Sequence, residues 1–482
     1  MTETVIAAES RPLLLAGKPT TSSESLPVVF PYAGSEIARV SLAGEALVEQ
    51  ALASAAAAEA EVAALPPFRR AEILIAAAEL VRSREDELAR QMTLETGNAV
   101  WETRFEVQRT TEILRLAGEE ARRIASTGEF VPIDGVPRGE GRIGLTRRFP
   151  IGTVLAITPF NAPLLLVAHK LGPALAAGCP CIVRPASKTP LSALSLGEIV
   201  LEAGAPPAAV SVVPCATGLA ERMVADERVK VLSFTGSAAV GWRLQKVAAT
   251  PRVTLELGGN GAVIVEPDAD LDYVAQRCAF GGFLRAGQAC ISVQRLYAHS
   301  SIHETLRDKL LERIAELRTG NPLDEATVVG GLIDEAAAEK AEALVNEAVA
   351  AGGRVLCGGT REGTVVSPTL LVDVPETLRV CAEEAFAPIV VLSPYDDVDA
   401  AIELANDTPF GLQAGLFSND IRVIHRAFER LEVGALIVND VNTFRVDQMP
   451  YGGAKRSGHG REGMAWAIRE MTEERLLVID PR

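Results

Sequence analysis

A regular alternation of strand-like and helix-like segments between residues 152 and 257 is the strongest constraint on the fold. Short runs rich in β-branched and other apolar residues occur at 152–158, 181–184, 210–213, 229–234 and 253–257. Between these runs, apolar residues recur at helical spacing over 164–177, 192–203, 219–225 and 238–248. Because strands that alternate with helices form a parallel sheet covered on both faces, this part is predicted to be a doubly wound α/β domain.

The alternation starts again after residue 270, with a helical segment to 284, a strand at 294–299, helices at 302–317 and 335–351, and a strand at 388–392. This second series predicts a second α/β domain. Helical periodicity over 46–65, 69–96 and 99–124 predicts a helical layer ahead of both. A length of 482 residues fits about three domains.

Residues 128–149 separate the helical layer from the first sheet. Residues 128–144 are rich in glycine and proline, and the alternation over 142–149 predicts an exposed β ribbon. Residues 150–169 carry no charge and approach the length of a membrane span. Pro159, Asn161 and Pro163 interrupt that stretch, so we expect a strand, a loop and a helix, and no membrane span.

Composition excludes several functional classes. With 47 Lys and Arg against 63 Asp and Glu, the net charge of −16 opposes nucleic-acid binding and favours a small-molecule protein. Seven cysteines without regular spacing indicate reduced thiols, and Cys179 and Cys181 lack the second pair that a zinc site needs, so no metal is expected. The first ten residues lack the basic and apolar order of a secretory signal, which predicts a cytoplasmic location.

Four short segments carry candidate chemistry. FTGSAAVG at 234–241 places a glycine turn between a strand and a helix, where backbone N–H groups hold phosphates, although a plain connection is the alternative. Cys290 follows a small-residue loop, yet most single cysteines are inert. Glu256 lies in an apolar strand, where a carboxylate is either a general base or half of a structural ion pair. Asn161 ends another strand, where its side-chain amide either donates to an oxyanion or only forms a turn.

These features in combination resemble the aldehyde dehydrogenase superfamily over nearly the whole chain. Five further segments are similar to that family's signatures and occur in the same order: ETG at 95–97, KLGPAL at 170–175, EEAFAP at 383–388, NDTPFGL at 406–412 and PYGGAKRSG at 450–458. The runs at 438–447 and 290–295 are most similar to the branch that handles lactaldehyde, glyceraldehyde 3-phosphate and phosphonoacetaldehyde.

The resemblance implies a mechanism. Cys290 attacks the aldehyde carbonyl, and Asn161 together with the Cys290 backbone N–H holds the oxyanion. After hydride transfer to the nicotinamide, Glu256 activates the water that hydrolyses the thioester to the carboxylic acid. Lys170 is expected to support these groups.

The resemblance also implies a cofactor site for NAD or NADP. Its predicted residues are Thr158, Pro159, Arg184, Ser187, Lys188, Gly236, Ser237, Leu257, Glu384 and Phe386. Many family members carry a carboxylate where this chain has Ser187, and that acid binds the ribose hydroxyls. Because this chain has Ser187 between Arg184 and Lys188, we expect NADP to be accepted, and the preference between NAD and NADP stays open.

The implied substrate tunnel is lined by Leu166, His169, Leu284 and Arg445. A histidine and an arginine there indicate a small polar or anionic aldehyde rather than an aromatic or aliphatic one. The alternative for Arg445 is an ion pair with Asp447 or with a surface acid. Two other readings of the chain are a CoA-acylating aldehyde dehydrogenase, which Glu256 opposes, and a catalytically silent scaffold, which the presence of both Cys290 and Glu256 opposes.

The expected fold is therefore a Rossmann-like cofactor domain, an α/β catalytic domain and a small β oligomerisation element. We assign residues 1–124 and 150–257 to the first, 258–458 to the second, and 125–149 with 472–482 to the third. Residues 476–479 form an unbroken apolar strand, which needs a covering partner and predicts a homodimer or homotetramer.

Overall fold

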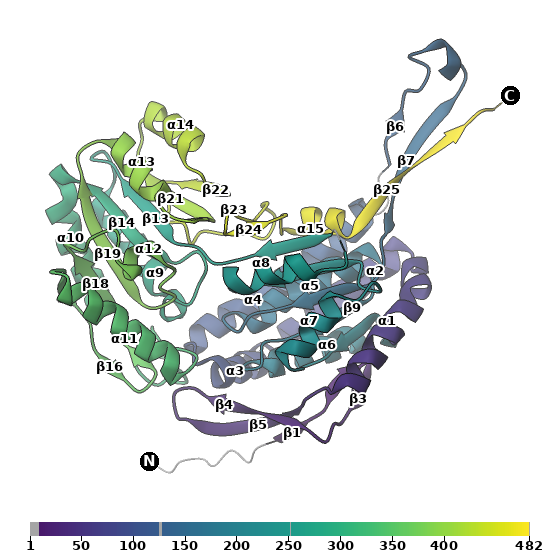
Figure 1. Ribbon diagram of the computed structural model, residues 1–482, viewed down its shortest axis with the longest axis horizontal. Coiled ribbons are helices and arrows are strands. Elements are labelled where there is room, and N and C mark those ends of the chain that lie inside the picture. Colours follow the sequence, from purple (N-terminus) through teal and green to yellow (C-terminus); the bar gives the residue numbers. More distant parts are fainter. Residues whose placement is uncertain (1–8, 125–127, 251, 482) are drawn as a thin grey trace.

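The structure is a computed structural model that describes residues 9–124, 128–250 and 252–481. Two α/β bodies lie side by side, and a narrow β ribbon projects away from them (Figure 1). The predictions for residues 1–8, 125–127 and 482 lie outside the described residues. In the described part of the chain, no helix is both long and apolar enough to cross a membrane.

The first body is built on an eight-stranded sheet. Its strands lie in the order β24 (Gly458–His459), β12 (Val253–Glu256), β11 (Val231–Thr235), β8 (Val154–Ile157), β9 (Cys181–Arg184), β10 (Val210–Val212), β2 (Leu13–Leu15) and β3 (Lys18–Thr20). The five strands from β12 to β10 are parallel, which confirms the predicted doubly wound sheet. The chain moves outward from β8 through β9 and β10, and then returns to the other side through β11 and β12.

This strand order positions the site. In an open α/β sheet, ligands bind outside the carboxyl ends of the strands at the point where the order reverses, here between β8 and β11. The segment 158–161 follows β8, the turn at Gly236 follows β11, and Glu256 ends β12. Thr235 is paired with Glu256 across two of these strands. Three of the four candidate segments therefore meet at one edge.

Helices cover both faces of this sheet. The helices of the first body are α1 (Glu45–Ala64), α2 (Pro67–Ser83), α3 (Glu85–Thr96), α4 (Val100–Ile124), α5 (Pro163–Ala177), α6 (Pro190–Glu202), α7 (Thr217–Val224) and α8 (Ala238–Val247). Alternate residues of β8 belong to two separate cores: Val154 and Ala156 pack with α2 to α6, whereas Leu155 and Ile157 pack with α1, α7 and α8. The single helix predicted over 69–96 is wrong, because non-helical dihedral angles at Arg84 (φ −110°, ψ 24°) divide it into α2 and α3.

The second body has a seven-stranded sheet. Its order is β15 (Arg354–Cys357), β18 (Thr369–Val372), β19 (Ile389–Tyr395), β14 (Val293–His299), β13 (Gly261–Val265), β21 (Gln413–Phe417) and β22 (Ala435–Val438), with β15 antiparallel at one edge. Its helices are α9 (Leu271–Phe283), α10 (Ser300–Ala315), α11 (Glu335–Ala350), α12 (Arg379–Ala382), α13 (Val398–Asn406) and α14 (Ile421–Arg430). The sequence predicted α9 to α11, β14 and β19, but it missed β13, β15, β18, β21, β22 and α12 to α14.

Smaller elements complete the chain. The ribbon consists of β6 (Phe130–Val131), β7 (Ile143–Pro150) and β25 (Thr472–Ile479). Strand β25 pairs antiparallel with β7 over its full length, so the tail joins the ribbon that precedes the first sheet. Helix α15 (Met464–Glu470) packs against α5. A three-stranded sheet of β1 (Glu9–Arg11), β5 (Ser35–Ser41) and β4 (Ser25–Phe30) lies along the N-terminal helices (Figure 1). Two further pairs are β16 (Arg361–Glu362) with β17 (Val365–Val366), and β20 (Phe410–Gly411) with β23 (Ala454–Lys455).

Candidate active site

A cavity of about 260 Å³ lies at the carboxyl edge of β8, β11 and β12. Most of the predicted site residues line it: Pro159, Asn161, Leu166, Gly236, Ser237, Glu256, Leu257, Cys290, Glu384, Phe386 and Arg445. It is also lined by Tyr451 and Glu462, which the sequence analysis did not single out. Tyr451 lies inside one of the quoted signatures, whereas no local pattern marks Glu462.

Cys290 is carried by a strained turn between α9 and β14. Arg285 and Ala286 (φ 53° and 52°) and Gly287 (φ 72°) adopt left-handed backbone conformations. A side chain at Gly287 would place its Cβ 2.0 Å from the Ala387 carbonyl oxygen, so only glycine fits this turn. Burial raises the pKa of the Cys290 thiol to about 11, although a hydrogen bond with Tyr451 and the charge of Arg445 oppose the shift. The resting side chain is therefore a thiol at neutral pH.

Glu256 is a buried carboxyl group without hydrogen-bond partners. It is 3% exposed, and neither carboxylate oxygen is hydrogen-bonded to any residue that the structure describes. Burial, and then the negative charge of Glu462, raise its pKa well above the usual range. An acid with these properties binds a proton strongly, as a general base for water must.

Asn161 presents its amide to the same cavity. Its Nδ2 donates a hydrogen bond to the Gln288 carbonyl oxygen at 2.8 Å, which fixes the side chain next to the Cys290 loop. A side-chain amide has two N–H donors, so one remains to donate to an oxyanion.

The charged residues of α5 lie behind the cavity wall rather than in it. All fifteen residues of α5 are buried, including His169 and Lys170. Lys170 Nζ donates hydrogen bonds to Glu462 Oε1 and to Ser233 Oγ, each at 3.0 Å. His169 Nε2 lies 3.3 Å from Asp447 Oδ1, and burial together with the charge of Arg445 lowers the pKa of His169. The expectation that His169 lines the cavity therefore does not match its position.

Arg445 lies in the cavity wall and is 8% exposed. Its Nη2 lies 3.2 Å from Glu462 Oε2, and its guanidinium stacks 3.6 Å from the centre of the Tyr451 ring. The distance from Nε to Asp447 is 4.0 Å, and Nε has no hydrogen-bond acceptor among the described residues. The main ionic partner is thus the buried Glu462 rather than a surface acid.

The N-terminus of α8, the helix that follows β11, is a candidate phosphate site. Ser237 is the N-cap of α8, and its side chain makes no capping hydrogen bond. The first N–H groups of a helix that lack a side-chain cap are donors for an anion. A Cβ at Gly236 would approach the Phe234 ring to 2.7 Å, so this turn excludes larger side chains. These residues fit a pyrophosphate.

Glu384 and Phe386 form the opposite part of the cavity wall. Glu384 Oε1 accepts a hydrogen bond from the Gly259 N–H at 3.1 Å, and burial raises the pKa of Glu384 to about 7. A Cβ at Gly258 would lie 2.2 Å from Glu384 Oε2, so a larger residue there would displace the Glu384 carboxyl group. Phe386 packs edge-to-face on Phe160, with ring centres 5.9 Å apart.

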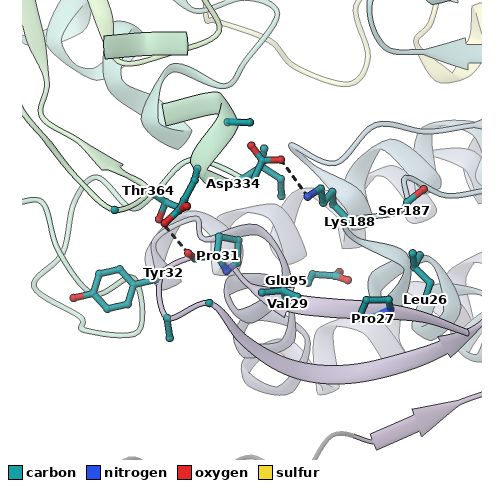
Figure 2. Close-up of a pocket in the computed structure, with 16 residues that line it drawn as sticks. Leu26, Pro27, Val29, Pro31, Tyr32, Glu95, Ser187, Lys188, Asp334 and Thr364 are labelled. Carbon is teal, nitrogen blue, oxygen red and sulfur yellow. Dashed lines mark hydrogen bonds and ion pairs between the residues drawn. The ribbon is translucent and has the colours of Figure 1, made fainter. Parts of the chain in front are cut away.

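Other predicted site residues lie outside this cavity. Thr158 is buried at the end of β8, and Leu284 is half-buried at the start of the Cys290 turn. Arg184 Nη2 donates to the Cys215 carbonyl oxygen at 3.0 Å. Ser187 and Lys188 line a second cavity of about 700 Å³, in which Lys188 points at Asp334, 3.1 Å away (Figure 2).

A cysteine, a buried carboxyl group and a side-chain amide share this cavity with a glycine turn at a helix N-terminus, an arrangement typical of enzymes that act on a carbonyl group with a dinucleotide. The model of the aldehyde dehydrogenase family matches residues 19–477. The chain belongs to the aldehyde dehydrogenase family, as its resemblance predicted.

Relatives of known name agree. The chain is 43% identical over 472 residues to 3-sulfolactaldehyde dehydrogenase from Priestia aryabhattai, covering 97% of this chain and 98% of the relative. Aldehyde dehydrogenase 21 from Physcomitrella patens, in complex with the reaction product succinate, matches with a TM-score of 0.96 and 40% identity. The match covers 98% of this chain and 99% of that chain. Glyceraldehyde-3-phosphate dehydrogenase GapN from Methanocaldococcus jannaschii, complexed with NADP, matches with a TM-score of 0.91 and 34% identity, over 95% of this chain and 100% of that chain.

The fold and the reaction type are thereby settled. The aldehyde dehydrogenase fold is confirmed, and the protein is an oxidoreductase of the aldehyde group that uses NAD or NADP.

Proposed function

We propose that this enzyme oxidises a small anionic aldehyde to its carboxylic acid. The observation that carries the proposal is Arg445, a buried cation in the cavity wall whose Nε has no acceptor among the described residues. Arg445 and two further cations, Arg109 and Lys170, lie near the two carboxylates Asp447 and Glu462. While Glu256 is protonated, this group of side chains therefore carries one positive charge in excess. A carboxylate, sulfonate or phosphonate compensates such a charge.

In the proposed mechanism Cys290 is the nucleophile. Its sulfur forms a bond to the aldehyde carbon, and the carbonyl oxygen becomes an oxyanion that accepts hydrogen bonds from Asn161 Nδ2 and from the Cys290 backbone N–H. A bound NAD(P)⁺, held by Gly236, Ser237, Glu384 and Phe386, would supply the acceptor for the hydride of this adduct. The product of that step is a thioester on Cys290.

Glu256 then completes the reaction. Its carboxylate takes a proton from water, which attacks the thioester carbon, and the acid product leaves as the Cys290 sulfur regains its proton. A base that activates water would hydrolyse an acyl group intended for CoA, which is the reason to reject a CoA-acylating enzyme. Lys170 acts indirectly in this scheme, because it holds Glu462 beside Glu256.

For the cofactor we propose Gly236 and Ser237 at the pyrophosphate and Glu384 with Phe386 at the nicotinamide ribose. Ser187 supplies no carboxylate to repel a 2′-phosphate, and Arg184 supplies a nearby cation, which supports acceptance of NADP. Lys188 contributes less, because Asp334 already compensates its charge. An efficiency with NAD a hundredfold above that with NADP would contradict this part of the proposal.

We also propose that residues 128–149 and 472–481 form an oligomerisation element, beside a cofactor domain (up to 124, and 150–257) and a catalytic domain (258–458). Leu476, Leu477, Val478 and Ile479 are between 40% and 56% exposed on an edge strand of the ribbon. Such an edge needs a covering partner, which supports a homodimer or a dimer of dimers. A monomeric mass by light scattering at micromolar concentration would contradict it.

The decisive test compares anionic aldehydes with neutral analogues of equal length by absorbance at 340 nm, with Cys290→Ala as the inactive control. In Arg445→Leu we expect kcat/KM for the anionic aldehyde to fall about 10- to 100-fold more than for its neutral analogue, from the loss of charge-assisted hydrogen bonds. Because loss of this cation also perturbs Glu256 for every substrate, the ratio between the two aldehydes isolates recognition of the charge. An unchanged ratio would remove the basis for an anionic substrate.

A further inference from the structure

The Cys290 sulfur has a hydrogen-bonding partner that the mechanism above does not use. The Tyr451 hydroxyl oxygen lies 3.0 Å from Cys290 Sγ, and both side chains line the cavity. A phenol hydroxyl donates well to a thiolate, since hydrogen bonds to a charged group are roughly twice as strong as neutral ones.

The position of this hydroxyl is fixed from several sides. The backbone of Tyr451 exchanges two hydrogen bonds with Glu462, at 3.1 and 2.7 Å. The ring is 3% exposed and packs with Ile291 and Leu412 in a small apolar cluster against Cys290. The hydroxyl therefore has little freedom to leave the sulfur.

The surroundings of the ring keep the hydroxyl protonated, so that it can donate. The Arg445 guanidinium on the ring face favours ionisation and lowers the pKa of Tyr451, but this effect is the smaller one. Burial, followed by the charge on Cys290, raises the pKa of Tyr451 well above its usual value. The phenol thus keeps its proton while the thiol loses its own.

We propose that Tyr451 is a catalytic residue whose hydroxyl positions the Cys290 sulfur and donates a hydrogen bond to the thiolate. When the S–H bond breaks, the electron pair stays on sulfur and the proton passes to ionised Glu256, which releases it to solvent and is again a carboxylate before the hydrolysis step. The Tyr451 proton is shared with that sulfur but not transferred. This proposal rests on the proposed nucleophilic role of Cys290.

The test is the alkylation of Cys290 by iodoacetamide in Tyr451→Phe, followed between pH 6.5 and 9.5 by peptide mass spectrometry. Loss of one hydrogen bond to a charged group corresponds to a rise of about one to two pKa units. The thiolate fraction then falls about 10- to 100-fold, while the greater nucleophilicity of a more basic thiolate recovers about 3- to 10-fold. We therefore expect alkylation about 3- to 10-fold slower at each pH, and a lower kcat.

Two variants separate the hydroxyl from the ring. Tyr395→Phe is the matched control, because the buried Tyr395 hydroxyl bonds to the Val265 carbonyl oxygen and not to a cysteine; we expect wild-type alkylation there. Tyr451→Leu removes ring and hydroxyl together and is expected to lose at least as much reactivity as Tyr451→Phe. If Tyr451→Phe alkylates at the wild-type rate across the pH range, the proposal is overturned, whatever the leucine variant does.

Failure of this proposal differs from failure of the proposed function. If Cys290→Ala retains NAD(P)H formation, Cys290 is not the nucleophile and both are overturned. If Cys290→Ala is inactive but Tyr451→Phe reacts normally, only the role of Tyr451 is lost.

Discussion

The buried ion pair between Lys170 and Glu462 is predicted to set the pH dependence of thioester hydrolysis. The two side chains are 0% and 3% exposed, and their charged atoms are 3.0 Å apart. Glu462 raises the pKa of Glu256, whereas Lys170 lowers it by a smaller contribution. Removing Glu462 is therefore expected to lower the pKa of Glu256, and removing Lys170 is expected to raise it.

Hydrolysis requires the ionised form of Glu256, so its rate increases with pH through the pKa of that group. In Glu462→Gln a negative neighbour is lost, the pKa of Glu256 falls, and the rise moves to lower pH. In Lys170→Met a positive neighbour is lost, and the rise moves to higher pH. Lys170→Met also removes one of the two cations that bind the buried Glu462, while Arg445 stays 3.2 Å away, so it is expected to cost about 1.5–3 kcal/mol of unfolding free energy.

The assays are single-turnover hydrolysis of the acylated enzyme between pH 6 and 9, and unfolding in urea. Lys188→Met is the matched control, because Lys188 pairs with Asp334 at a similar distance of 3.1 Å but its side chain is 57% exposed. It should cost less than about 1 kcal/mol and leave the pH profile unchanged. Shifts of Glu462→Gln and Lys170→Met in the same direction, or no shift in either, would refute Glu256 as the titrating base.

Three other outcomes are expected. Asn161→Ala should lower kcat by about 10²- to 10³-fold through loss of an oxyanion donor, measured as NAD(P)H formation, with cofactor affinity unchanged. We expect the NAD(P)H affinity of the wild type, measured by cofactor fluorescence, to rise as pH increases through about 7, where Glu384 ionises. Glu384→Gln should abolish this rise, and a persistent rise would exclude Glu384 as its source. Burial opposes the shift, but His169 and Arg109 hold the pKa of Asp447 below its usual range. The ionised Asp447 therefore contributes to the free energy of unfolding above about pH 4, and this contribution is lost as pH falls further. Asp447→Asn should therefore be less stable than wild type at pH 7 in urea unfolding, and the difference should narrow toward pH 3.

Local patterns in the sequence carried most of the fold and the chemical class. The alternation over residues 152–257 specified a parallel sheet, because strand and helix periodicities depend on neighbouring residues in the chain. The glycine turn at Gly236, Glu256 at the end of β12 and Asn161 after β8 were only candidates on local grounds, and their roles came from the resemblance of the whole chain to aldehyde dehydrogenases. Strands β13 and β21 were missed, because a short buried apolar run carries no periodicity that separates strand from helix.

Only the tertiary structure decided which side chains meet. Lys170 and Glu462 are 292 residues apart, and Cys290 and Tyr451 are 161 apart, yet each pair is in hydrogen-bonding contact. The sequence placed His169 in the cavity, whereas its ring lies behind the wall, against Asp447 and Arg445. The role of Lys188 at the cofactor stays a prediction, and the structure pairs its side chain with Asp334 in a second cavity. Short-range periodicity determines the elements, but side-chain pairing depends on how distant elements pack, which no local pattern encodes.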